Sequence, residues 1–75
     1  MDISLFDKRN GTQIEPHSVH GMLWLQTHFE SIHWESLRNG LIIIPFKDAK
    51  LLIEDAIKAG IYVNYINSLS QLDKI

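Results

Sequence analysis

The stretch from residue 41 to residue 66 reads LIIIPFKDAKLLIEDAIKAGIYVNYI and decides the fold. It begins with four aliphatic residues, Leu41–Ile44, which show no polar alternation. Such a run is typical of a strand that is covered on both faces. Pro45 ends it. The last residues of the stretch, Ile61–Ile66, are mainly β-branched and aromatic, and they predict a second strand.

An amphipathic helix is predicted between these two strands, over residues 47–59. Its apolar face is formed by Ala49, Leu52, Ile53 and Ala56. Charged residues surround that face, and Gly60 is a typical stop for a helix. The order strand, helix, strand predicts a right-handed crossover between parallel strands. The two strands are either adjacent or separated by another strand.

A β-hairpin is predicted near the N-terminus, where two β-prone runs flank a polar loop that ends in Asn10-Gly11. A tight turn made by this pair alone places Asp7 opposite Ile14, a charge opposite an apolar residue. A four-residue loop, Lys8–Gly11, places Leu5 opposite Ile14 instead and gathers apolar side chains on one face. We therefore expect the longer loop.

A first helix is predicted from residue 17 to residue 29. Its apolar residues recur at spacings of three and four: Val19, Met22, Leu23, Leu25 and Phe29. Ser18 is placed to cap its N-terminus, whereas Gly21 weakens its first turn. The next segment, residues 30–38, is predicted to form a short helical turn that ends at Asn39-Gly40.

Together these elements predict one small α/β domain of the α+β type over residues 1–75. The expected order is an N-terminal β-hairpin, a helix, a short helical turn and then strand–helix–strand. We expect one mixed sheet of about four strands with the helices packed on it. Residues 67–75 are expected to form a frayed tail or a short docking helix, since Leu69, Leu72 and Ile75 are three apart.

The composition predicts a folded chain, because 45% of the residues are hydrophobic. The chain has no cysteine, which excludes disulfides and thiolate metal sites. Its net charge is −2, and its seven Lys and Arg residues are scattered, so no nucleic-acid partner is expected. No signal peptide and no membrane-spanning run are evident. We expect a cytoplasmic protein with no membrane partner.

The most unusual local feature is a group of four histidines, His17, His20, His28 and His33, with Trp24 and Trp34 among them. On a helical wheel, His17, Trp24 and His28 lie opposite the apolar side of the first helix, with His20 nearby. If the apolar side faces the core, Trp24 projects outward between histidines.

Three hypotheses account for this group. In the first, another part of the fold covers Trp24, and the histidines are ordinary surface residues. In the second, Trp24, His20, His28 and Trp34 form a protein–protein or homodimer surface, because tryptophan is enriched at binding hot spots. In the third, the histidines bind a metal ion.

The metal hypothesis faces a geometric limit. His17 and His20 are three apart and can share an ion, but His17 and His28 are separated by about 16 Å along a helix. A zinc site needs three or four ligands. Glu15, His33 or a second subunit would have to supply the others.

Motifs of catalysis are missing from the sequence, which contains no G-x-G-x-x-G, P-loop or G-x-S-x-G pattern. We expect no catalytic residue and no cofactor. The leading hypothesis is a small, non-enzymatic interaction or regulatory module that binds a protein partner, or itself, through the surface around the first helix. The alternative is a metal- or small-ligand-binding protein that uses the histidine group.

Overall fold

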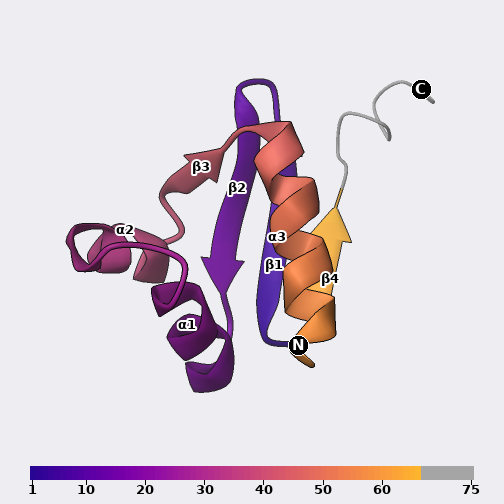
Figure 1. Ribbon diagram of the computed structural model, residues 1–75. Helices are drawn as coiled ribbons and strands as arrows, with labels where there is room; N and C mark the ends of the chain where they lie inside the picture. Colours follow the sequence, from indigo (N-terminus) through magenta and orange to yellow (C-terminus); the bar gives the residue numbers. More distant parts are fainter. Residues whose placement is uncertain (67–75) are drawn as a thin grey trace.

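The computed structural model describes residues 1–66 of the chain, and its elements follow the predicted order (Figure 1). They are β1 (Ile3–Lys8), β2 (Gly11–Pro16), α1 (Val19–Gln26), a 3₁₀ turn (Ser31–His33), α2 (Trp34–Arg38), β3 (Ile42–Ile44), α3 (Phe46–Lys58) and β4 (Val63–Ile66). The tail or docking helix expected for residues 67–75 lies outside the described residues. No helix among the described residues is long and apolar enough to cross a membrane.

The strands form one mixed four-stranded sheet in the order β3-β2-β1-β4. β1 is antiparallel to β2 and parallel to β4, and β2 is antiparallel to β3. It follows that β3 and β4, the two strands joined through α3, run parallel to each other with β2 and β1 between them. The prediction of an α+β fold with a mixed sheet is confirmed.

The hairpin has the predicted register but a shorter turn. Leu5 pairs with Ile14 as expected, and the ladder continues to the pair Lys8 and Gly11. The turn therefore consists of Arg9 and Asn10, and the expected four-residue loop is wrong. Gly11 belongs to β2, where a Cβ atom would lie 2.5 Å from the carbonyl oxygen of Ile44. This glycine lets β3 approach β2 closely.

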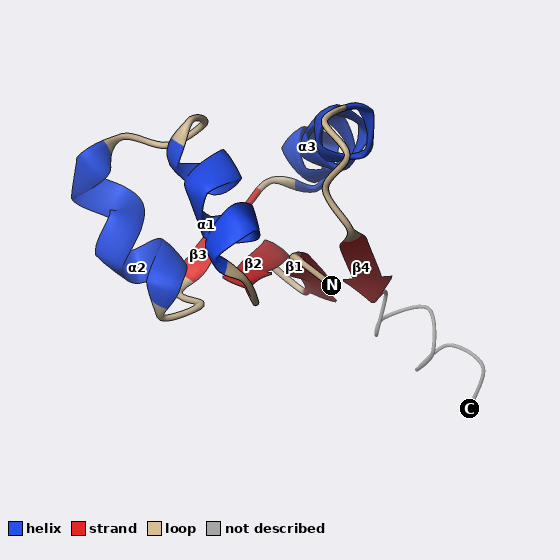
Figure 2. Cartoon of the chain, turned by 90° about the horizontal axis from the view of Figure 1, so that it is seen from below, coloured by secondary structure: helices blue, strands red, loops and turns tan. Residues whose placement is uncertain are grey.

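The helices lie together on one face of the sheet, with α1 and α2 over the β2–β3 side and α3 toward β4 (Figure 2). The core lies between the helices and the sheet and consists of Ile3, Leu5, Ile14, Leu25, Leu37, Ala49, Leu52, Ala56 and Ile61. The aliphatic run Leu41–Ile44, which contains β3, was expected to be covered on both faces. This expectation is wrong, since Ile43 is 43% exposed. β3 is an edge strand, and the helices cover only one of its faces.

Helix α1 has the predicted cap, because the Ser18 hydroxyl accepts a hydrogen bond from the Gly21 amide at 2.9 Å. The helix is shorter than predicted, and its predicted inner face is correct only in part: Leu25 lies in the core, and Met22 and Phe29 pack against it. Val19 is 76% exposed and Leu23 56% exposed, while Gly21 and Leu25 are buried.

A close contact at Gly21 explains why the helix is rotated relative to the prediction, with Val19 and Leu23 toward solvent. A Cβ atom on Gly21 would lie 2.3 Å from the carbonyl oxygen of Asp2, so only glycine permits this approach. Residues three, four and seven positions further on share its face of the helix. Within α1 those residues are Trp24 and Leu25, and His28 lies in the turn that follows the helix. The glycine that weakens the helix locally thus determines which of its sides faces the sheet.

Asp2 links the start of α1 to the start of β4. Its backbone amide donates to the carbonyl of Tyr62 at 2.9 Å, and its carbonyl accepts from the His17 amide at 2.8 Å. Its carboxylate accepts from the Ser18 hydroxyl at 2.7 Å and from the Tyr62 amide at 3.0 Å. The Ser18 bond, followed by the Tyr62 bond, lowers the pKa of Asp2 below its usual value.

Replacing Gly21 with alanine tests the close contact. In an ordinary helix, Gly→Ala raises stability by about 0.5–1 kcal/mol. Here we expect Gly21→Ala to lower the free energy of unfolding by about 1 kcal/mol or more, because the new methyl group overlaps the Asp2 carbonyl. Urea unfolding followed by circular dichroism measures the change. Leu23→Ala, at an exposed position of the same helix, is the control, with an expected change within about 0.5 kcal/mol. A stabilised Gly21→Ala variant would contradict the contact.

Candidate functional site

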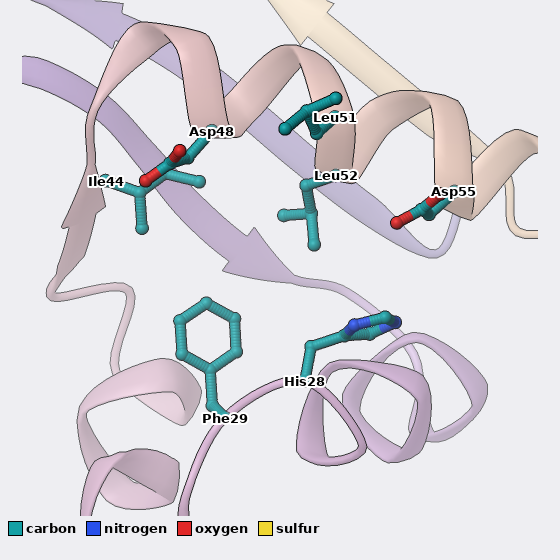
Figure 3. Close-up of a pocket in the computed structure, with 7 residues that line it drawn as sticks. All are labelled: His28, Phe29, Ile44, Asp48, Leu51, Leu52 and Asp55. Atoms are coloured by element: carbon teal, nitrogen blue, oxygen red, sulfur yellow. The ribbon is translucent and has the colours of Figure 1, made fainter.

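An open groove of about 310 Å³ separates the end of α1 from α3. Its apolar residues are Phe29, Ile44, Leu51 and Leu52, and its polar residues are His28, Asp48 and Asp55. Figure 3 shows His28 and Phe29 across from α3, with the two aspartates at opposite ends of the helical stretch. The groove thus has an apolar middle and a carboxylate at each end.

Helix periodicity places four of these residues along one side of α3. Asp48, Leu51, Leu52 and Asp55 are spaced so that they form a row of two turns. Leu52 is buried and forms part of the floor, while Leu51 is 60% exposed. The two aspartates are exposed and are separated by roughly 10 Å along the helix axis.

Both tryptophans support the opposite wall. The Trp24 ring packs on the His28 ring, with centroids 4.2 Å apart and planes tilted by 54°. The Trp34 indole donates a hydrogen bond to the carbonyl of Phe29 at 2.9 Å. Both tryptophans are half-buried against the core, so the expectation that Trp24 projects outward is wrong. Their contacts hold the two residues that line the groove.

Of the residues predicted for an interface, the structure brings Trp24 and His28 into contact. His28 is exposed and lines the groove, whereas Trp24 and Trp34 lie behind its wall. His20 is exposed on α1 and does not line the groove. The interface role of these residues stays a prediction.

The residues predicted for a metal site are not brought together. His17 Nε2 is hydrogen-bonded to the Ser4 hydroxyl at 2.8 Å. Across residues 1–66, no three or more His, Asp or Glu side chains are grouped so that they could hold a metal ion. Within this described part of the chain, His17, His20, His33 and Glu15 therefore form no metal site. A site completed by a second subunit stays a prediction.

Sequence reasoning missed the contribution of α3, because its charged residues were treated as a solvent-facing surface. One signal was available in the sequence. Leu51 lies beside Leu52 and outside the predicted apolar face of the helix. An exposed leucine at such a position widens the apolar stripe toward one flank. Nothing in the sequence indicated that Phe29 would lie across from it.

A polar cluster surrounds Asp7 near the C-terminal end of β1, away from Asp2. The buried carboxylate accepts a hydrogen bond from the Thr12 hydroxyl at 2.8 Å and another from the Tyr65 hydroxyl. These residues come from three neighbouring strands. The bond to Asp7 is the main cause that raises the pKa of Tyr65 to about 12. Because both carboxylate oxygens bind side chains of the sheet, we assign this cluster to the stability of the fold.

The fold and the groove define a small, single-sheet α+β domain with an apolar surface groove. The chain belongs to the family described as the cyanobacterial NIF11-like domain, whose family model matches residues 4–68. The match covers every residue of the groove and all of the sheet except Ile3, the first residue of β1. No curated protein and no solved structure matches the chain significantly.

The Tyr65 hydroxyl provides a test of the Asp7 cluster. A spectrophotometric titration should show one phenol that ionises near pH 12, and Tyr65→Phe should remove it. The folded-state pKa lies above the usual 10.0, so the stabilisation is complete below pH 10 and is lost as the pH rises toward 12. Tyr62→Phe is the control and should retain the late ionisation. A late ionisation that persists in Tyr65→Phe would refute the assignment.

Proposed function

We propose that this domain is a non-enzymatic interaction module that binds a partner polypeptide in the groove between α1 and α3. The observation that carries the proposal is the exposed apolar surface of the groove. Leu51, beside the half-buried Phe29 and the buried Leu52, leaves apolar area in contact with water. Covering such area is favourable by about 25 cal/mol per Å². Exposed apolar surface with a polar rim is typical of an interaction site.

The shape of the groove favours a polypeptide over a small molecule. Pockets for small ligands have volumes of about 300–1,000 Å³ and enclose most of the ligand. This groove lies at the lower end of that range and is open along its length. An enzyme also benefits from a site that closes and excludes water. A row of side chains inserted from a partner helix is a better match to an open groove between helices.

The binding surface predicted from the sequence was centred on the first helix. The proposed surface still includes the residues directly after α1, but its centre lies in the groove between α1 and α3. The groove takes His28 and Phe29 from the turn that follows α1 and takes most of its remaining lining from α3. Trp24 and Trp34 act through the residues that they hold in place. The Trp24 ring packs on His28, and the Trp34 indole donates a hydrogen bond to the carbonyl of Phe29. We propose that any regulatory role of the domain is exercised through the partner bound in this groove.

A matched pair of α3 variants tests the proposal. Leu51 is 60% exposed and lines the groove, while Ile57 is 63% exposed on the same helix and does not. Peptides selected from a random display library for binding to the native domain are measured again on Leu51→Ser and Ile57→Ser. Losing the leucine contact should weaken groove binders by about tenfold or more, which corresponds to about 1.4 kcal/mol. Ile57→Ser should bind them as the native domain does.

Two outcomes would overturn the proposal. One is a selection that yields no peptide sensitive to Leu51→Ser. The other is a set of binders that lose affinity equally in both variants, which would indicate a general effect on α3. Circular dichroism of both variants confirms that the fold is retained. Sedimentation of the native domain identifies a second copy as the occupant if the groove variant alone abolishes self-association.

A further inference from the structure

The charges around the groove are of one sign. Among the described residues 1–66, Asp48 and Asp55 are the two carboxylates that line it, and no lysine or arginine does. Neither carboxylate forms a hydrogen bond or an ion pair with another of the described residues 1–66. The remaining titratable group at the groove is His28, which packs on Trp24. An apolar strip with a carboxylate at each end, neither of them paired within the described part of the chain, is therefore open to a partner.

We infer that the groove selects a basic amphipathic helix, with a Lys or Arg residue on each side of its apolar residues. This inference rests on the proposed function and specifies the partner. Asp48 and Asp55 are seven residues apart, about two turns of helix. A partner helix that lies along α3 brings two basic residues at positions i and i+7 to the two carboxylates. Its apolar residues at i+3 and i+4 then cover Leu51 and Leu52.

The chemistry of basic side chains suits this geometry. Lys and Arg pack their aliphatic stems along apolar surface while the charged group reaches outward. The stems would lie against the ends of the apolar strip, and the charged groups would reach the carboxylates at its rim. Arginine can also bind a carboxylate through two parallel hydrogen bonds.

A second copy of this chain does not offer the required pattern. Its seven basic residues are Lys8, Arg9, Arg38, Lys47, Lys50, Lys58 and Lys74, and no two of them are seven apart. The occupant is accordingly a different polypeptide. Negative charge at the groove also opposes phosphate groups, which disfavours nucleic acid and anionic membrane surfaces as occupants.

Three synthetic peptides of about 15 residues test the inference. They share one helical leucine pattern and carry either Lys, Gln or Glu at two positions seven apart. Fluorescence anisotropy with the intact domain gives the three dissociation constants. We expect the Lys peptide to bind about tenfold or more tightly than the Glu peptide, with the Gln peptide between them. The difference should shrink between about 0.05 M and about 0.5 M salt, because ions screen exposed charges.

Charge-neutralising variants assign the effect to the two carboxylates. We expect Asp48→Asn and Asp55→Asn each to weaken binding of the Lys peptide by about two- to fivefold, with little effect on the Gln peptide. The control is Glu54→Gln, which removes one negative charge from α3 at a position that does not line the groove. This control should change binding of the Lys peptide by less than about twofold.

Two results would overturn the inference while leaving the proposed function intact. One is a Lys peptide that binds no more tightly than the Gln and Glu peptides. The other is a double variant, Asp48→Asn with Asp55→Asn, that binds the Lys peptide as tightly as the control Glu54→Gln with Glu35→Gln. The proposed function is decided separately by the sensitivity of selected peptides to Leu51→Ser. Groove binders without a basic pair would therefore contradict the partner chemistry alone.

Discussion

The hydrogen bonds of Asp2 are the constraint on which the arrangement of the helices depends. Its carbonyl and carboxylate hold His17 and Ser18, directly before α1, and the same carboxylate holds Tyr62, directly before β4. The lowered pKa of Asp2 means that the ionised carboxylate is the form that these bonds favour. One residue beside the edge of β1 therefore positions α1 and the end of the segment that contains α3. The groove is the space left between these two elements.

Gly21 determines which side of α1 faces the sheet. Because a side chain at that position would overlap the Asp2 carbonyl, the glycine face of the helix is the face that approaches the sheet. Leu25 then enters the core, and Trp24 packs behind His28. The rotation leaves Val19 and Leu23 in water, which is unfavourable for the apolar side of a helix. A contact between residues far apart in the sequence thus outweighs the local apolar periodicity.

The parts of the fold that follow from local chemistry were predictable from the sequence. Leu5 and Ile14 defined the hairpin register by sharing an apolar face, Ser18 was the expected cap, and the apolar period predicted α3. The face of α1 was not predictable, because it depends on the contact between Gly21 and Asp2. The groove was not predictable either, since it joins the end of α1 to α3. Sequence patterns describe each helix separately, whereas a groove depends on the distance between two of them.

The inner face of α3 determines how closely this helix lies on the sheet. Ala49 and Ala56 are buried with Leu52 between them, and such small side chains allow the helix to lie close to the sheet. Leu51 lies on the flank of the helix, where it lines the groove and remains exposed. Larger residues in place of the alanines would overfill the space between α3 and the sheet and force the helix outward. The same packing that stabilises this small core therefore suits the groove to inserted side chains rather than to an enclosed ligand.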